Sequence, residues 1–478
     1  MATDSTLNHD ELYIEGRWTP TADRIDVTDL TDDTTFASVS AATPADAEDA
    51  LAAAQAAEAE MRETTVVQRA EWVTAIADGI EARKAELADV IVREAGKPIS
   101  SARGEVDAAA ERFRRAAEEA RSLKGEYIEG TTEGHEGWRA IVRHEPVGTA
   151  LCITPYNYPL STTALQVAPA LAAGNAVILK PASKTPISAA ILAEIIVDAA
   201  EDLPEGAFGF VPGRASEIGD VLAGDDRIDA IAMTGSSGAG KHVAGVSGMV
   251  ELHMELGGNA PAIVFPDADL EAASSAAASG SLKYAGQRCS AVSRVLVHED
   301  AHDELVDRID AEMEGFEPGD LFDEETSLGP LISHEQAEWV EELVEDALDR
   351  GATLVRGGSR SGRFFEPTLL ADVPQDARIV HEEQFGPVVA VTTFDDEAGA
   401  LEVANGGSLG LDAAVFTADY DRAMRVADRL EVGGVRINGA PSHGLGDIPF
   451  GGTKDSGIGR EGIGYTIEAF LERKSIIL

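Results

Sequence analysis

The sequence predicts an α/β protein built from two helix-covered parallel sheets, and three observations support this prediction. Short apolar runs alternate with amphipathic ones between residues 147 and 256. A second alternating block runs from residue 261 to about residue 438. Between residues 44 and 121, Ala, Glu and Arg recur at helical spacing instead. Alternation of strand-length and helix-length patterns is typical of βαβ units, whose parallel strands need a crossover helix.

The elements follow from these patterns in chain order. The helical region begins where Pro44 follows Thr43, because Pro suits the first position of a helix. In the first alternating block we expect strands at 148–153, 176–179, 209–211 and 228–233, with helices at 165–171 and 187–200. In the second block we expect strands at 262–265, 294–298, 387–391, 413–416 and 434–437.

Length and charge limit the class of protein. A chain of 478 residues is too long for one ordinary core, so we expect two or three domains. The formal net charge is −47, and the acidic residues are spread over every predicted helix, which indicates an acidic surface. Such surfaces are similar to those of proteins from salt-loving organisms, where salt screens the self-repulsion. This charge argues against nucleic acid or an anionic membrane as a partner.

The cysteine content and the absence of targeting patterns predict a cytoplasmic protein. Only two cysteines occur and nothing marks them as a pair, so a reducing compartment is expected. The N-terminus has no basic segment followed by an apolar one, so we expect no signal peptide. A membrane-spanning helix needs about 18 consecutive apolar residues, and Gly, Pro and charged residues interrupt every candidate run.

Cys289 is the candidate nucleophile. It follows Gly286-Gln-Arg in a polar loop, where the neighbouring Arg288 and the loop amides are expected to favour the thiolate. The other cysteine, Cys152, lies inside the strand expected at 148–153, so we interpret it as a small buried hydrophobe. A thiolate that attacks a carbonyl also needs a nearby carboxylate to drive hydrolysis of the resulting thioester.

Glu255 is the candidate base. It stands between Met254 and Leu256, directly before two glycines. Apolar surroundings raise the pKa of a carboxylic acid toward neutrality, which suits a general base. The alternative interpretation is an ordinary solvated carboxylate.

A candidate dinucleotide site follows the strand expected at 228–233. The common fingerprint G-x-G-x-x-G is absent after the first strand. Instead, Thr234-Gly-Ser-Ser-Gly-Ala-Gly240 follows a strand and opens a helix, whose N-terminus is a natural site for a phosphate. The alternative is a tight strand-to-helix turn without a ligand.

Seven motifs in order resemble the aldehyde dehydrogenase superfamily, over the chain from about Tyr13 to the C-terminus. They are Thr154-Pro-Tyr-Asn157-Tyr-Pro159, Leu179-Lys-Pro-Ala-Ser183-Lys, Thr234-Gly-Ser-Ser-Gly-Ala-Gly240, Glu255-Leu-Gly-Gly258, Gln287-Arg-Cys289, Glu382-Glu-Gln-Phe385-Gly-Pro387 and Pro449-Phe-Gly-Gly452. The resemblance implies a Rossmann-like cofactor domain, a second α/β catalytic domain and a small β oligomerisation arm.

The resemblance also implies domain boundaries. They are 1–125 and 146–256 for the NAD(P)-binding domain, 257–445 for the catalytic domain, and 126–145 with 465–478 for the oligomerisation arm. The arm implies a homodimer or a homotetramer. Oligomerisation is also physically sensible, because an apolar terminal strand left unpaired is an aggregation hazard.

The implied activity is NAD(P)-dependent oxidation of an aldehyde to a carboxylic acid, with Cys289 as nucleophile and Glu255 as base. Asn157, otherwise a turn residue, matches the amide that holds the oxyanion together with the backbone N–H of the nucleophile. No metal ligands are expected. The positions that match cofactor contacts are Thr154, Pro155, Tyr156, Lys180, Ser183, Lys184, Gly213, Gly219, Thr234, Gly235, Ser236, Leu256, Glu383 and Phe385.

Cofactor choice is expected to lean toward NADP, with NAD or dual use left open. Ser183 stands where many NAD-preferring relatives have a glutamate, whose carboxylate would repel a 2′-phosphate. Lys180 and Lys184 flank it, and their ammonium groups can pair with that phosphate. If Lys184 points to solvent instead, the site does not discriminate between NAD and NADP.

The substrate is expected to be a small polar aldehyde, such as a hydroxyaldehyde, a phosphorylated aldehyde or a semialdehyde. The motifs look most like the branch of non-phosphorylating glyceraldehyde-3-phosphate and lactaldehyde dehydrogenases, in which Tyr158 and Arg288 match residues of the phosphate-accepting pocket. His443 departs from that branch, which has an arginine there, and it is mostly neutral near pH 7. A carboxylate or a hydroxyl group is therefore as plausible as phosphate.

Two alternatives stay open. A CoA-acylating semialdehyde dehydrogenase of the same superfamily generally lacks a glutamate at the position of Glu255, so this chain favours water as the acyl acceptor. A catalytically silent binding or structural protein on the same fold would not need nucleophile, base and oxyanion amide together.

Overall fold

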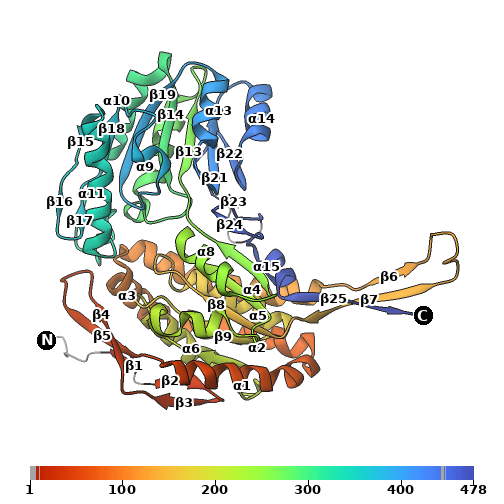
Figure 1. The fold of residues 1–478 in the computed structure, drawn as a ribbon. Coiled ribbons are helices and arrows are strands. Elements are labelled where there is room, and N and C mark those ends of the chain that lie inside the picture. The colour runs from red at the N-terminus through yellow and green to blue at the C-terminus, as the bar shows by residue number, and fades with distance from the viewer. Residues whose placement is uncertain (1–6, 10, 443–445, 447) are drawn as a thin grey trace.

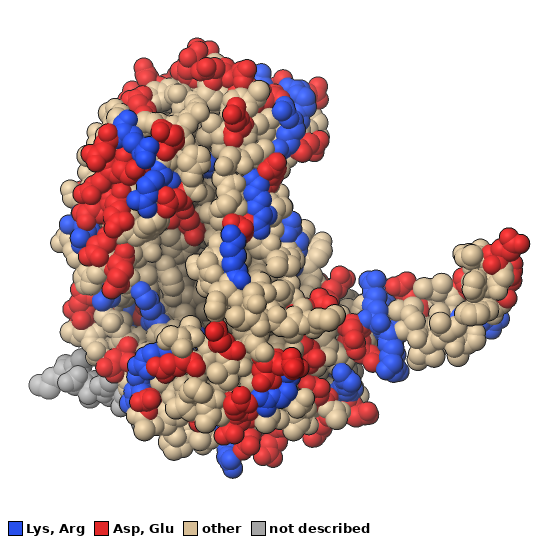
Figure 2. Space-filling view, in the orientation of Figure 1, with Lys and Arg blue, Asp and Glu red and all other residues tan. Residues whose placement is uncertain are grey.

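The computed structural model describes residues 7–9, 11–442, 446 and 448–478, and it has two α/β lobes with a long arm beside them (Figure 1). Asp and Glu side chains are spread over both lobes in the view of Figure 2, as the distribution along the sequence predicts. No helix in the described part of the chain is long and apolar enough to cross a membrane.

The first lobe is built around an eight-stranded sheet in the order β24, β12, β11, β8, β9, β10, β2, β3. Strands β8 to β12 are parallel, and antiparallel strands flank them at both edges. The bounds are β2 Glu11–Ile14, β3 Arg17–Pro20, β8 Thr149–Ile153, β9 Ala176–Lys180, β10 Phe208–Phe210, β11 Ala230–Thr234, β12 Glu251–Glu255 and β24 Gly457–Ile458.

All four strands expected in this block are present, and β12 is an additional one. Its sequence, Glu251-Leu-His-Met-Glu255, carries a polar residue at every second position. That pattern does not resemble the continuous apolar run of a buried parallel strand. His253 and Glu255 are nevertheless buried, so this strand brings polar groups into the interior.

Helices cover the first sheet. Thr43 and Asp46 form a capping box at the start of α1, with Pro44 in the first turn as predicted. The bounds are α1 Pro44–Glu63, α2 Val66–Ala82, α3 Lys84–Ala95, α4 Ile99–Ser122, α5 Ser161–Ala173, α6 Ile187–Ala199, α7 Asp220–Ala223, α8 Ser237–Val246 and α15 Ile463–Ala469.

The second lobe contains a seven-stranded sheet in the order β15, β18, β19, β14, β13, β21, β22. Only its edge strand β15 is antiparallel to its neighbour. The strands are β13 Ala260–Val264, β14 Val292–His298, β15 Thr353–Arg356, β18 Thr368–Ala371, β19 Val388–Phe394, β21 Asp412–Phe416 and β22 Gly434–Ile437. Its helices are α9 Leu270–Leu282, α10 His302–Met313, α11 His334–Asp349, α12 Arg378–His381, α13 Glu397–Asn405 and α14 Tyr420–Arg429.

The arm is a three-stranded sheet in the order β25, β7, β6 and carries the C-terminus (Figure 1). Its strands are β6 Glu126–Glu129, β7 Arg139–Pro146 and β25 Leu471–Ile477. The strand part of the arm thus begins later than the predicted boundary at 465. Residues before it lie in α15, because Ile463, Ile467 and Phe470 are buried in the core of the first lobe.

Short strand pairs complete the fold. Strands β1 Leu7–His9, β4 Arg24–Thr28 and β5 Thr35–Ser40 form a small sheet. Two further pairs are β16 Arg360–Ser361 with β17 Phe364–Phe365, and β20 Leu409–Gly410 with β23 Thr453–Lys454.

Candidate active site

A cavity of about 1040 Å³ lies between the two lobes. From the first lobe it is lined by the segments that follow β8, β11 and β12, at the carboxyl ends of these parallel strands. From the second lobe it is lined by the segments that precede β14 and β19. Ligands of open parallel sheets bind at the carboxyl ends of the strands, so this cavity is the expected place for one.

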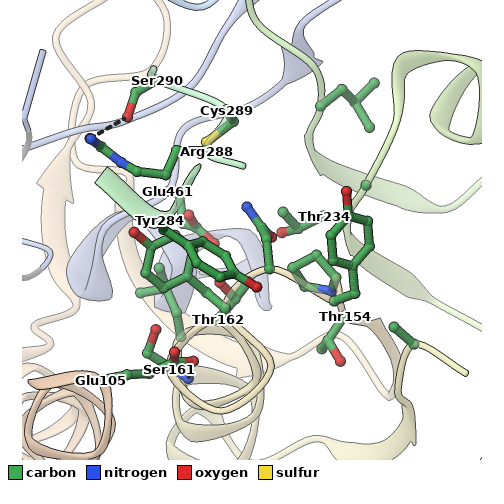
Figure 3. Close-up of a pocket in the computed structure, with 18 of the residues that line it drawn as sticks. Glu105, Thr154, Ser161, Thr162, Thr234, Tyr284, Arg288, Cys289, Ser290 and Glu461 are labelled. Carbon is green, nitrogen blue, oxygen red and sulfur yellow. Dashed lines mark hydrogen bonds between the residues drawn. The ribbon is translucent and has the colours of Figure 1, made fainter. Parts of the chain in front are cut away.

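Cys289 lines the cavity, together with its neighbours Arg288 and Ser290 (Figure 3). The loop also lies close to the end of β12, since a Cβ atom added to Gly258 would lie 2.2 Å from the Cys289 carbonyl oxygen. Only a glycine allows this approach. Cys152, by contrast, is fully buried inside β8, as predicted.

The expectation that the surroundings favour the Cys289 thiolate holds for Arg288, whose charge lowers the pKa of the thiol, but not for the site as a whole. Burial raises the pKa of the Cys289 thiol, and the negative charges of Asp412 and Glu255 raise it further. Arg288 acts in the opposite direction but does not outweigh them. A thiol in such surroundings keeps its proton until a base removes it.

Glu255 ends strand β12 and is buried with only 2 % of its surface exposed. Burial raises the pKa of its carboxyl group well above the usual value, and the nearby Glu461 adds to the rise. The cause is the one the sequence predicts. The sequence does not predict where the carboxylate lies. It packs against Gly451, where an added Cβ atom would be 2.5 Å from Glu255 Oε1. Leu256 and Gly257 line the cavity next to it.

Asn157 also lines the cavity, in the segment between β8 and α5. Its Nδ2 donates a hydrogen bond to the backbone oxygen of Gln287, two residues before Cys289, at 2.9 Å. An amide nitrogen carries two N–H groups, so a second donor remains for another acceptor. The predicted oxyanion amide and the predicted nucleophile are therefore brought together.

The other predicted cofactor residues fall into two groups. Nine of them line the cavity: Thr154, Pro155, Tyr156, Thr234, Gly235, Ser236, Leu256, Glu383 and Phe385. The remaining five lie on the loops after β9 and β10 or at the end of β9, outside that lining: Lys180, Ser183, Lys184, Gly213 and Gly219.

Helix α8 begins at the cavity, as the Thr234–Gly240 motif predicts. The Ser236 hydroxyl caps this helix by accepting a hydrogen bond from the Ala239 N–H at 3.3 Å. The first-turn amides of the ten-residue helix are thus presented beside cavity-lining residues. That arrangement is suited to an anionic phosphate.

Glu383 and Phe385 approach the cavity from the second lobe. Glu383 Oε1 accepts a hydrogen bond from the Gly258 N–H at 2.8 Å, and burial raises the pKa of this carboxyl group to about 7. Phe385 has a positive φ of 47° and its ring meets the Tyr156 ring edge-on at 6.0 Å. The segment is anchored by α11, whose Gln336 and Trp339 side chains donate to its backbone oxygens.

The loops after β9 and β10 are tied together by a hydrogen bond from the Ser183 hydroxyl to the Gly213 oxygen, at 3.0 Å. Lys180, at the end of β9, is buried, and burial lowers its pKa to about 8. Lys184 is exposed and lies near Glu335. Gly219 ends the helical turn Ala215–Gly219.

The predicted substrate residues are only partly described. Tyr158 and Arg288 both line the cavity, and Arg288 Nη2 donates weakly to the Ser290 hydroxyl at 3.4 Å. His443 lies outside the described residues.

Several charged residues of the cavity were not predicted. Arg112 on α4 lines it, and its Nη1 donates to the Ser161 oxygen at 2.5 Å. The Nε of Arg112 makes no hydrogen bond within the described ranges. Lys97 and Glu105 form a fully buried ion pair, and the Lys97 ammonium lies 3.6 Å from the centre of the Tyr158 ring.

Glu461 is another unpredicted residue of the cavity wall. It lies beyond β24 in the sequence, and burial raises the pKa of its carboxyl group to about 7 while the nearby Arg112 lowers it. Within the residues that the structure describes, no group of three or more His, Cys, Asp or Glu side chains is placed to hold a metal ion.

The fold and this cavity, with the start of a helix at the carboxyl ends of parallel strands, fit the class of dinucleotide-dependent oxidoreductases. The chain belongs to the aldehyde dehydrogenase family. The sequence model of this family, described as "Aldehyde dehydrogenase family", matches residues 18–476.

Individual relatives cover nearly the whole chain. A 3-sulfolactaldehyde dehydrogenase of Priestia aryabhattai is 36% identical over 468 residues, which are 98% of this chain and 97% of the relative. An NADP-dependent glyceraldehyde-3-phosphate dehydrogenase of Streptococcus equinus is 38% identical over 418 residues, 87% of each chain.

A solved structure has the same fold. It is the NADP-dependent glyceraldehyde-3-phosphate dehydrogenase of Bacillus halodurans C-125 complexed with NADP, with a TM-score of 0.96 and 36% identity. The match covers 98% of this chain and 99% of that one.

Proposed function

We propose that this enzyme oxidises a small anionic or hydroxylated aldehyde to its carboxylic acid, with Cys289 as nucleophile and with NADP or NAD as cofactor. The observation that supports this most directly is the convergence of Cys289, Asn157, Arg288 and Arg112 on one cavity, beside the start of α8. The small polar aldehydes named for the relatives from Priestia and Streptococcus agree with this choice.

The reaction begins when Cys289 Sγ loses its proton to a base and bonds to the aldehyde carbon. The carbonyl oxygen becomes an oxyanion, which the free N–H of Asn157 Nδ2 and the Cys289 N–H stabilise. A bound NAD(P) would supply the acceptor for the hydride of that carbon. The carbon is then a thioester of Cys289, and a water molecule that gives its proton to Glu255 releases the acid and the thiol.

The chain fits a dinucleotide cofactor. The first turn of α8, with Ser236 as its cap, offers backbone N–H groups to the pyrophosphate. Glu383 and Phe385 flank the place for the nicotinamide end, close to Cys289. Lys180 and the Ser183–Gly213 pair lie on the neighbouring strand ends, where the adenosine end belongs.

Glu255 has to turn before it can serve as base. In this structure its carboxylate lies against Gly451, although its backbone adjoins the cavity-lining Leu256 and Gly257. We infer that rotation about its side-chain bonds brings the carboxylate toward the Cys289 thioester, since the Glu255 charge already acts on Cys289. A water acceptor also separates this enzyme from the CoA-acylating alternative.

The cationic side of the cavity supports an anionic substrate. Arg112 and Arg288 reach it from different lobes, and Arg112 has an N–H that no residue of the described ranges uses. Glu105 also lines the cavity, but it is neutralised by Lys97. A charge-assisted hydrogen bond from a guanidinium to a carboxylate, sulfonate or phosphate is stronger than one to a neutral oxygen.

The experiment compares an anionic aldehyde with propanal in wild type and Arg112→Ala. Loss of a charge-assisted contact of about 1.5–3 kcal/mol corresponds to a rise in KM of about tenfold to a hundredfold for the anionic aldehyde. The KM for propanal should change by less than about threefold. Arg121→Ala, an exposed change on the same helix, is the matched control. Equal losses for both aldehydes would contradict the anionic assignment.

We further propose that the arm joins copies of the chain into a homodimer or homotetramer. It exposes large apolar side chains on its strands, in the connection between β6 and β7 and at the C-terminus, namely Tyr127, Ile128, Trp138, Ile141, Ile476, Ile477 and Leu478. Such a surface on a sheet is usually covered by a partner. Light scattering of the full chain and of Ile476→Lys would test this.

A cytoplasmic location and adaptation to high salt complete the proposal. Both cysteines are free, which suits a reducing compartment. The net charge of −47 supports a requirement for salt.

A further inference from the structure

Gln287 is fully buried, does not line the cavity and lies two residues before Cys289. Its side chain makes two hydrogen bonds to the segment that leads into α11. Oε1 accepts from the Ile332 N–H at 2.9 Å, and Nε2 donates to the Pro330 oxygen at 3.3 Å. Its backbone oxygen accepts from Asn157 Nδ2 at 2.9 Å. One residue therefore connects the nucleophile loop, the oxyanion amide and a segment of the second lobe.

The backbone before Gln287 is strained and needs such an anchor. Tyr284, Ala285 and Gly286 have φ values of 56°, 50° and 73°, three left-handed residues in a row. Each non-glycine residue in this region costs on the order of 1–2 kcal/mol. The turn is held at its start by the Tyr284 hydroxyl, which donates to the Ala95 oxygen at 2.7 Å. The side chain of Gln287 holds it at the other end.

The anchoring segment is itself fixed. Leu331 and Ile332 are buried in the second lobe, and Ser333 caps α11. The same helix donates to the backbone oxygens of residues 383–385 through Gln336 and Trp339. The position of the Gln287 carbonyl is thus set by packed secondary structure rather than by a free loop.

The Gln287 carbonyl determines which end of the Asn157 amide faces the nucleophile. It accepts only an N–H, so the nitrogen end of the amide is directed toward the loop and the oxygen end away from it. The second N–H of Asn157 is then available at the cavity. If the Asn157 amide were turned by 180°, its oxygen would face the cavity instead. The partial negative charge of that oxygen would repel the substrate oxyanion.

We propose that Gln287 is a positioning residue for catalysis. Its side-chain clamp on Pro330 and Ile332 fixes the backbone carbonyl that orients Asn157 for the oxyanion. This inference rests on the proposed roles of Asn157 and Cys289. It adds that Gln287 acts through Asn157, without touching substrate or cofactor.

The test is a double-mutant cycle on the rate of the pre-steady-state burst of NADPH. Gln287→Met keeps the length of the side chain and removes both side-chain hydrogen bonds. Asn157→Ala alone should slow the burst by about 10²–10³-fold, the usual loss for one oxyanion donor. Gln287→Met should slow it by about tenfold or more in wild type, but by less than about twofold when Asn157 is already Ala.

Gln287→Glu provides the conservative variant. It retains an acceptor for the Ile332 N–H, so its burst rate should lie between those of wild type and Gln287→Met. Asn175→Ala is the matched control, because Asn175 is also a fully buried amide bonded to backbone groups, at the start of β9. Asn175→Ala should change the burst rate by the same factor in wild type and in the Asn157→Ala background.

The outcomes are distinguishable. Equal effects of Gln287→Met in the two backgrounds would show a merely structural role and overturn the proposal. An Asn157→Ala enzyme with an unchanged burst would instead overturn the oxyanion role itself, and with it the proposed mechanism. If Gln287→Met does not fold, the same cycle with Gln287→Glu decides between additive and non-additive effects.

Discussion

Replacing Glu255 by Gln should stop the reaction halfway. The change removes the base and keeps the size of the side chain. Cys289, Asn157 and the start of α8 are untouched, so the thioester should still form. We therefore expect a burst of about one NADPH per subunit, followed by slow turnover, because no carboxylate then activates water.

The size of the loss follows from the surroundings of the side chain. A general base contributes about 10²–10⁴-fold, or about 2.7–5.4 kcal/mol of activation free energy. We expect about 10²–10³-fold, the lower part of that range, because Glu461 also lines the cavity and, with a pKa of about 7, can accept a proton in place of Glu255. Glu461→Gln is the control and should slow turnover less than Glu255→Gln does.

The pH dependence provides a second measurement. Because burial raises the pKa of Glu255, its basic form is present above that raised pKa and is lost as the pH falls through it. Wild-type turnover should therefore decline on the acidic side, and Glu255→Gln should lose this decline. A raised carboxyl pKa also means that stability is lost as the pH rises through it, so Glu255→Gln should be more stable than wild type at pH 8.

Stopped-flow absorbance for the burst and thermal unfolding at pH 5 and pH 8 test these statements together. An unchanged steady-state rate, or a wild type that turns over only with CoA, would refute the assignment of Glu255 as the base for hydrolysis.

Three other predictions follow from the site and the charge. Cys289→Ala should abolish oxidation and leave NADP binding, measured by calorimetry, unchanged. Cys152→Ala, inside β8, should keep turnover within about threefold and lower the free energy of unfolding by about 1 kcal/mol. The reverse pattern would identify Cys152 as the nucleophile. Ser183→Glu should lower the ratio of kcat/KM for NADP over NAD by at least about tenfold, since a carboxylate near the Gly213 oxygen would repel a 2′-phosphate, and a wild type that uses only NAD would contradict this. Folding and activity should increase from about 0.1 M to about 2 M KCl, because the screening length falls from about 10 Å to 3 Å or less and the chain carries a charge of −47; full stability in salt-free buffer would argue against salt adaptation.

Much of the fold could be predicted because it depends on local patterns. Strands such as β8, β9 and β19 contain continuous apolar runs, and the cap of α1 is a local motif at Thr43. Strand β12 could not be predicted in this way. Its side chains His253 and Glu255 are polar although they are buried, so these five residues lack the apolar pattern from which a buried strand is predicted.

The parts of the site that escaped prediction depend on contacts between distant segments. Arg112 looks like one of several arginines on a solvated helix, and only the packing of α4 beside α5 directs it to the cavity. The raised pKa of Cys289 results partly from Asp412, which is far away in sequence. The left-handed turn at Tyr284 and Ala285 has no signature either, because neither residue is one that favours positive φ.

The contrast between the nucleophile and the base indicates how one cavity can serve two half-reactions. The Cys289 loop is fixed by the strained turn, the Gln287 clamp and the close approach to Gly258. The Glu255 carboxylate, in contrast, makes no hydrogen bond within the described residues. Fixing the sulfur and the oxyanion donors favours bond formation, since these groups must not move. A base that can turn away leaves room for the cofactor beside the sulfur, and its return with water completes the second half-reaction.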